Sequence, residues 1–142
     1  MKKSEFLKYN GYKIIKMSLD YDNKNDSESD GLNIFYKVKE EDKDFNKVTV
    51  YQGILISPSK DFPYKLEVVI KGKFEFSKVI SFEDKKNMIL TNIPAIQYPY
   101  LRALISLISS QTDYEKILLP TMNFSEFLKK MKWEDILIKL KI

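Results

Sequence analysis

The chain contains neither cysteine nor histidine among its 142 residues. Without histidine it lacks the usual general base at neutral pH, and without both residues it lacks a thiolate nucleophile and nearly every zinc or copper site. The remaining carboxylates and lysines form no catalytic constellation that the sequence reveals. We therefore expect a protein that is not an enzyme and that uses no metal and no cofactor. Disulfide usage cannot indicate its redox compartment.

Long apolar runs are also missing, with one near exception. Residues 93–110, IPAIQYPYLRALISLISS, carry a single charged side chain at Arg102. A membrane span needs ~20 predominantly apolar residues, and here two prolines, a glutamine and an arginine interrupt the run. The N-terminus MKKSEFLKYN has no apolar segment of the kind that a signal peptide needs. We expect no membrane insertion, and a cytoplasmic protein.

The charge balance is basic but mixed. Net charge is +4 and the pI is about 9.0, which permits an acidic partner such as nucleic acid. The 24 basic residues are, however, interleaved with 20 acidic ones. The densest basic cluster, KKMK at 129–132, is typical of the solvated side of an amphipathic helix. We do not expect a nucleic-acid partner; a small basic nucleic-acid-binding or regulatory domain remains the alternative.

The first half of the chain alternates between apolar and polar residues. Four segments place apolar side chains at every second position, namely Ile15, Met17, Leu19 and Tyr21; Leu32, Ile34, Tyr36 and Val38; Val48, Val50, Ile54 and Ile56; and Leu66, Val68, Ile70, Phe74 and Phe76. A period of two predicts four antiparallel strands with one solvated face, over about residues 5–77. Gly72, inside the last segment, indicates a bulge or a close approach.

The second half changes to a helical period, over about residues 94–140. Pro99 suits the first turn of a helix, where its missing N–H costs little. A core stripe follows at Leu101, Leu104, Ile105 and Ile108. A second apolar stripe, Tyr100, Ala103 and Leu107, lies on another face of the same helix.

A final helix is predicted from Asn123, because Glu126 stands three residues later in a capping-box arrangement. Its apolar face changes after Met131, which indicates a bend or break near Lys132. The predicted fold is α+β, a four-stranded antiparallel sheet followed by two helices packed on one face. Residues 1–142 form a single domain.

The second stripe of the long helix needs a cover. A helix with two apolar faces must bury both, and the sheet can cover only one. The C-terminal helix of the same chain is one candidate for the other face. A second copy of the protein is the other candidate, through an isologous interface, and we favour it.

Residues 92–128, NIPAIQYPYLRALISLISSQTDYEKILLPTMNFSEFL, resemble part of the SecB family of protein-export chaperones. That family has a helix start of the form PY-x-R, a Ser-rich apolar helix, a loop, and an L-x-P-x-N-F helix start. The matching residues here are Pro99, Tyr100, Arg102, Leu118 or Leu119, Pro120, Asn123 and Phe124. Four strands before two helices is also the order of elements in the family.

The resemblance implies a homotetramer, a dimer of dimers with the long helices between the sheets. The second stripe (Tyr100, Ala103 and Leu107) would then lie at the oligomer interface. The implied activity is ATP-independent binding of unfolded or non-native polypeptides, in protein export or in the protection of an antitoxin. Such a holdase needs adaptable apolar surface rather than a catalytic pocket.

Family positions also imply client-binding residues. These are Leu118, Leu119, Met122, Phe127, Met131 and Trp133 in the helical half, with Phe35 and Tyr51 on the sheet. Core packing is the alternative role for each of them. We expect core packing for Phe127 and Leu118. Met131 and Trp133 have charge-rich neighbours, and we expect them to be exposed at a rim.

The resemblance is incomplete on the exposed face of the sheet. Export members of the family dock the SecA motor ATPase through an acidic patch there. In this chain Asp20 and Glu67 occupy two of the patch positions, and Lys16 replaces a third acidic residue. Lysines at 65, 71 and 73 share the face with Glu67 and oppose an acidic patch. SecA docking would therefore rest on Asp20 and Glu67, and the members that serve toxin–antitoxin systems imply an antitoxin as the other partner.

Overall fold

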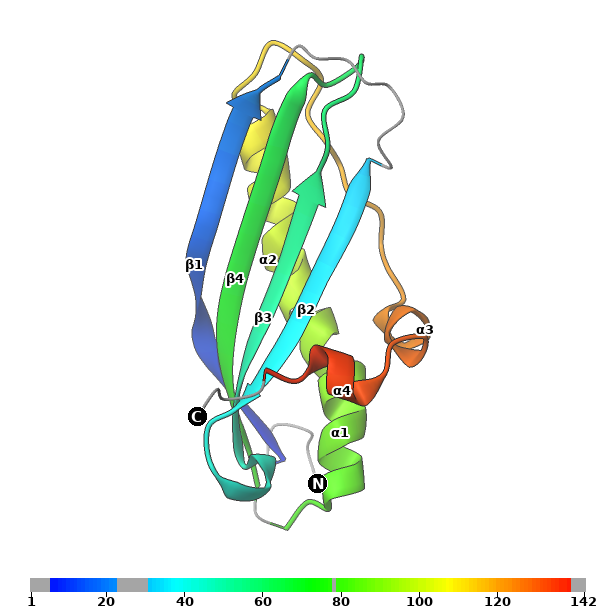
Figure 1. Cartoon of the computed structure of the whole chain (residues 1–142). Coiled ribbons are helices and arrows are strands. Elements are labelled where there is room, and N and C mark those ends of the chain that lie inside the picture. The colour runs from blue at the N-terminus through cyan, green and yellow to red at the C-terminus, as the bar shows by residue number, and fades with distance from the viewer. Residues whose placement is uncertain (1–5, 23–30, 78, 139–142) are drawn as a thin grey trace.

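The computed structural model describes residues 6–22, 31–77 and 79–138. Its first layer is an antiparallel sheet in the order β1-β4-β3-β2, so β1 and β2 are the edge strands (Figure 1). The strands are β1 (Leu7–Tyr21), β2 (Leu32–Glu40), β3 (Lys47–Ile56) and β4 (Tyr64–Phe76), and a 3-10 turn, η2 (Lys43–Phe45), joins β2 to β3.

The helices form the second layer, against one face of the sheet (Figure 1). They are α1 (Phe82–Leu90), α2 (Asn92–Ser109), α3 (Phe124–Lys129) and α4 (Trp133–Ile136). The long helix α2 crosses behind the sheet and packs on β4 and β3. This arrangement confirms the predicted α+β class and the helices on one face. Within the described ranges, no helix combines the length and apolarity that a membrane crossing requires.

The alternation of the strands is confirmed in β2, β3 and β4. In β4, Leu66, Val68 and Ile70 are fully buried beneath the helices, and Lys65 and Lys73 are exposed on the opposite face. We call that opposite face the open face of the sheet. One side of the sheet is therefore solvated, as the period of two predicts.

The predicted pattern of β1 is wrong at one position. The pairing of β1 with β4 shifts between Tyr9 and Tyr12, where Gly11 has a φ of 87°, and again between Ile14 and Lys16. The second shift inserts Ile15 as an extra residue, so Ile14, opposite Ile70, lies on the same side as Met17. A bulge moves every earlier residue of a strand by one position, and simple alternation cannot anticipate it.

Two features of the helical half also differ from the prediction. Pro99 lies inside α2 rather than in its first turn, where Pro94 is found instead. Pro99 leaves the carbonyl of Ala95 without its intrahelical partner, and the exposure of Ala95 makes this carbonyl accessible to water. The helix α1 was not predicted. Its N-cap Ser81 accepts a hydrogen bond from the Asp84 N–H at 3.2 Å.

The predicted start and break of the C-terminal helix are both confirmed. Asn123 caps α3 by accepting from the Glu126 N–H at 3.4 Å, and the chain leaves helical geometry before α4 begins at Trp133. After α4, Leu137 forms a parallel bridge with Val38 on the edge of β2. The Ile138 N–H donates to the Val38 carbonyl at 2.9 Å. Residues 139–142 lie outside the described residues.

A pair of buried glutamines joins α2 to the sheet. The Gln97 amide donates to the Gln52 side-chain oxygen at 3.1 Å, and the Gln52 amide donates to the Pro94 carbonyl at 3.3 Å. Gln97 lies directly over Gly72, where an added Cβ would stand 1.9 Å from its Oε1 atom. The expected close approach at Gly72 is therefore confirmed, because only glycine leaves room for the Gln97 side chain.

We predict that Gly72→Ala lowers the free energy of unfolding by about 2 kcal/mol, because Gln97 must move and lose its buried hydrogen bond to Gln52. Urea unfolding would measure the change. Gly31→Ala is the matched control, since a Cβ at Gly31 meets no atom within 4 Å. Adding Gln97→Ala to Gly72→Ala should restore part of the stability. Equal stability of the two single alanine variants would contradict the account.

Three tyrosines in or beside the core have raised pKa values. Tyr36 is buried and donates to the Ile89 carbonyl at 2.5 Å, and burial raises its pKa well above the ordinary value near 10. Burial, followed by the neighbours Tyr100 and Tyr12, raises the pKa of Tyr9 to about 12. Burial also raises the pKa of Tyr98, against the opposing effect of Arg102. All three hydroxyls therefore stay protonated in the fold at a pH where an unfolded tyrosine ionises.

We predict a loss of stability above about pH 10, where the unfolded tyrosines release protons and the folded ones retain them. The stabilising contribution is complete below that pH and disappears as pH rises through the folded-state pKa, about 12 for Tyr9. Urea unfolding at a series of alkaline pH values would show the slope. Tyr36→Phe should flatten the slope, whereas Tyr114→Phe, at the surface, serves as the control. A slope unchanged by Tyr36→Phe would refute the assignment.

Candidate binding surfaces

An apolar surface lies along the uncovered side of β1 and the adjacent side of α2. We call it the β1–α2 face; its exposed members are Ile14, Met17, Tyr21, Tyr100, Ala103 and Leu107. Leu107 is 58% exposed and Met17 is 51% exposed. The face exists because α2 packs on β4 and β3 and touches β1 chiefly through Tyr100, whose ring lies 4.6 Å from that of Tyr12.

The C-terminal segment covers the opposite side of α2. The rings of Tyr98 and Phe124 are 5.0 Å apart, and the Tyr98 hydroxyl donates to the Pro120 carbonyl. Leu128 and Ile136 are buried in the same core. The C-terminal helices therefore do not cover Tyr100, Ala103 and Leu107, and no other described segment of the chain covers this second stripe fully.

The segment 110–123 between α2 and α3 carries an exposed apolar side chain. Leu118 is 70% exposed, whereas its neighbour Leu119 is buried. The expectation of core packing for Leu118 is thus wrong, because in an extended segment successive side chains point to opposite sides and Leu119 takes the inward position. Met122 is half-buried. Ser109 holds the start of the segment by accepting from the Ile117 N–H at 2.8 Å.

Phe127, Met131 and Trp133 are half-buried and pack against the core. All three side chains are thus intermediate between the core packing expected for Phe127 and the exposure at a rim expected for Met131 and Trp133. The indole ring of Trp133 lies 5.8 Å from the ring of Phe45 and 6.2 Å from that of Phe82. The Lys86 ammonium stands 5.4 Å from the centre of its ring. An aromatic cluster between η2, α1 and α4 thus holds this end of the chain.

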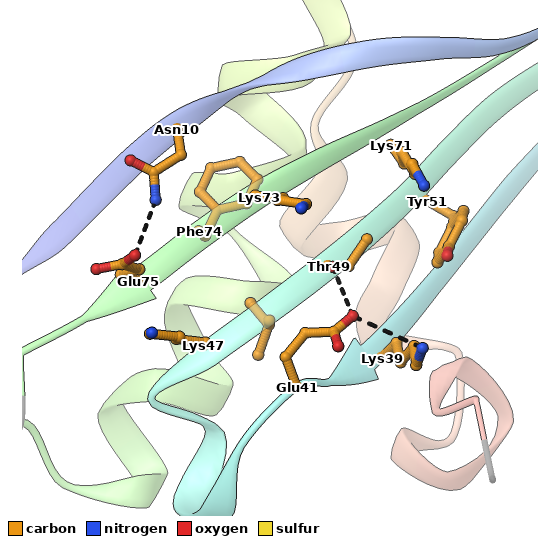
Figure 2. Close-up of a pocket in the computed structure, with 11 residues that line it drawn as sticks. Asn10, Lys39, Glu41, Lys47, Thr49, Tyr51, Lys71, Lys73, Phe74 and Glu75 are labelled. Carbon is orange, nitrogen blue, oxygen red and sulfur yellow. Dashed lines mark hydrogen bonds and ion pairs between the residues drawn. The ribbon is translucent and has the colours of Figure 1, made fainter.

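The two candidate residues on the sheet lie apart from those in the helical half. Phe35 is 45% exposed and Tyr51 is half-buried, both on the open face. Figure 2 shows Tyr51 beside Lys71, among polar side chains of that face. The eight client-binding candidates therefore form three groups rather than one groove. These are Leu118, Leu119 and Met122 in the segment 110–123; Phe127, Met131 and Trp133 in the C-terminal helices; and Phe35 and Tyr51 on the sheet.

The two residues that would dock a motor ATPase also lie on the open face, next to lysines. The Glu67 carboxylate forms an ion pair with the Lys16 ammonium at 2.6 Å. Asp20 stands opposite Lys65 in the pairing of β1 with β4. Each carboxylate is thus next to an opposite charge, which offsets the attraction that it would offer to a basic partner.

A hollow of about 430 Å³ beside α1 was not predicted from the sequence. It is lined by Phe6, Val79, Ile80 and Met88, with the polar residues Asp84, Asn87 and Asn92 at its edge. The segment between β4 and α2 contains no long apolar stripe, so its pattern predicts a connection. Its Ser-x-x-Asp cap at Ser81 was the signal for α1. Within residues 6–22, 31–77 and 79–138, no cluster of acidic side chains suited to a metal ion occurs.

Comparison with known proteins agrees with this geometry. The family model described as preprotein translocase subunit SecB matches residues 18–134. Among solved structures, the chain is similar to the Mycobacterium tuberculosis SecB-like chaperone Rv1957, which was solved with a ChAD peptide from the HigA1 antitoxin Rv1956. The TM-score is 0.67 at 10% sequence identity, over 83% of this chain and 88% of that chain. No curated protein sequence matches the chain. With four strands, a long covering helix and a family model that matches most of its length, the chain belongs to the SecB family.

Proposed function

We propose that the chain is an ATP-independent holdase chaperone that binds unfolded or non-native polypeptides in the cytoplasm. The observation that carries the proposal is apolar surface left exposed on two sides of one small domain, at the β1–α2 face and at Leu118. Exposed apolar surface of this kind marks an interaction site in a folded protein. Family membership supports a chaperone role for it.

The client surface that we propose lies on the β2 side, around Leu118, Leu119 and Met122. Near the C-terminal end of β2, the Val38 carbonyl points away from β3 and accepts a hydrogen bond from the Ile138 N–H. Backbone orientation repeats every two residues, so the groups of Ile34 point the same way, and no backbone bond from another described segment reaches them. Leu32 and Phe35 beside them are exposed. An extended client would add to this edge while Leu118 contacts its apolar side chains.

The half-buried residues of the C-terminal helices have a supporting role in this proposal. Phe127 and Met131 pack against the core, and Trp133 contacts α1 through Phe82. Side chains that pack on one side and remain partly open on the other can shift to fit different clients, and Met131 is the most adaptable among them.

The assembly that we propose is a homotetramer, a dimer of dimers, in which the β1–α2 face of one chain covers that of another. In an isologous contact the same patch of both chains meets across a two-fold axis, so β1 of one chain can pack against α2 of the other. Tyr100, Ala103 and Leu107 would form the helical part of the contact, and Met17 and Tyr21 the part from β1.

Of the two partner classes, we favour an antitoxin over the SecA motor ATPase. The neighbours Lys16 and Lys65 offset the charges of Glu67 and Asp20, which a basic motor surface would need. The similar M. tuberculosis chaperone was solved with a peptide from an antitoxin. A short apolar segment of an unstable antitoxin is a client that the β2 edge and Leu118 would accommodate.

We predict that the protein suppresses the aggregation of an unrelated, chemically unfolded protein without nucleotide, measured by light scattering at equimolar protein. Leu118→Glu should weaken suppression about threefold, because a charge replaces apolar contact area of the client surface. Val79→Glu is the matched control, because it turns an exposed apolar side chain acidic outside both the proposed client surface and the β1–α2 face. Full suppression by Leu118→Glu would exclude this leucine, and no suppression by the unaltered protein would exclude the function.

We predict a mass of four chains for the unaltered protein by light scattering. Leu107→Glu should reduce the mass, because each interface would bury two carboxylates in apolar surroundings. Leu118→Glu should leave the mass unchanged. A single-chain mass for the unaltered protein would disprove the assembly, and it would mean that the β1–α2 face stays open to solvent.

A further inference from the structure

We infer that the open face of the sheet carries a second binding site, for an acidic polypeptide segment in an extended conformation. The site is a hollow of about 390 Å³ at the η2 end of the sheet, shown in Figure 2. Its polar lining comes from every strand and includes four lysines, Lys39, Lys47, Lys71 and Lys73. It faces away from the helices, so it is separate from the surfaces of the proposed function.

The strand register places three of these lysines, Lys39, Lys71 and Lys73, in two rows across the sheet. Lys73 of β4 stands opposite Thr49 of β3, which stands opposite Lys39 of β2. The next row consists of Lys71, Tyr51 and Lys37 in the same order. Neighbouring strands lie about 4.8 Å apart and alternate residues about 6.6 Å apart. An extended peptide has the same repeat of about 6.6 Å between its alternate side chains, so it can meet successive lysines in register.

Three of the four ammonium groups have no acidic partner within the described part of the chain. The ion pairs there are Lys16 with Glu67 and Lys39 with Glu41, the latter at 3.8 Å. The ammonium groups of Lys47, Lys71 and Lys73 form neither an ion pair nor a hydrogen bond among the described residues, and Lys47 bonds to Asp42 only through its backbone N–H. Unpaired like charges around one hollow raise the local positive potential and attract an anionic ligand.

Two carboxylates in the same hollow indicate what kind of anion fits. Glu75 accepts from the Asn10 amide at 3.1 Å, and Glu41 accepts from the Thr49 hydroxyl at 2.8 Å. A nucleic-acid backbone carries a charge at every step and would be repelled by both. A peptide places N–H donors between its acidic side chains, and these donors match Glu41 and Glu75. Among the lining aromatics, Phe74 is buried on the core side, which leaves Tyr51 alone to stack on a base.

The charge of the chain also argues for a foreign partner rather than a second copy. The net charge is +4, so two copies repel each other at this face, whereas an acidic segment is attracted to it. Tyr51, expected at first to contact unfolded clients, would here contact the acidic segment instead. The site depends on exposed lysines and not on apolar contacts, so its binding should weaken as salt screens the charges.

Fluorescence anisotropy of a labelled peptide of alternating glutamate and serine, about ten residues long to span the sheet, would test the site. We expect binding at low salt that weakens about tenfold in Lys71→Glu with Lys73→Glu, since each exposed pair contributes modestly. The matched control is Lys60→Glu with Lys116→Glu, two exposed lysines outside the hollow with the same change in net charge. The control should keep its affinity within about twofold, and a peptide with glutamine for glutamate should bind about tenfold more weakly.

Three results would overturn the inference. These are no binding of the glutamate peptide, an equal loss in the control pair, and preferential binding of single-stranded RNA with the same dependence on Lys71 and Lys73. Circular dichroism would verify that both double variants are folded. Aggregation suppression by Lys71→Glu with Lys73→Glu should match that of the unaltered protein, so failure of this site and failure of the proposed function give different results.

Discussion

The close contact of α2 with the sheet at Gly72 and Gln97 is the constraint on which the architecture depends. Gln97 occupies the space that a side chain at position 72 would fill, and its bond to Gln52 places the helix over β3 and β4. The hydrogen bond from Gln97 to Gln52 is buried and directional, so it favours one position for the helix, although the Gln97 Oε1 atom has no hydrogen-bond partner among the described residues. A helix held over β3 and β4 cannot also cover β1. The uncovered β1–α2 face is therefore a direct result of the glutamine contact.

The two edges of the sheet, at β2 and at β1, have different surroundings, so the two sides of the domain differ. The β2 edge is joined near its C-terminal end by the C-terminal segment, through Val38 and Ile138. The β1 edge carries two bulges and receives no such segment from the described chain. An apolar strand edge that stays open promotes aggregation unless another chain covers it. Under the proposed function, the β1 side would serve self-association and the β2 side would hold clients.

The fold class followed from hydrophobic periodicity, and the details that escaped prediction share a physical origin. Alternation in β4 and the caps at Asn123 depend on neighbouring residues alone, so the sequence shows them directly. The bulge at Ile15, the position of Pro99 and the inward turn of Leu119 depend on contacts across the fold. The candidate site residues came from family positions, which name residues but not their surroundings. Whether Leu118 or Trp133 is open was therefore decided only by packing against α1 and α2.

The order of elements along the chain has a consequence for biosynthesis. All four strands are complete by Phe76, and the helices that cover their apolar face come later, from Phe82 onward. A ribosome adds about 5–20 residues each second, so the finished sheet waits for some seconds before α2 and the C-terminal segment can emerge. During that interval Leu66, Val68 and Ile70 lie bare on a nascent chain. A member of a chaperone family thus exposes apolar surface of its own while it is being made.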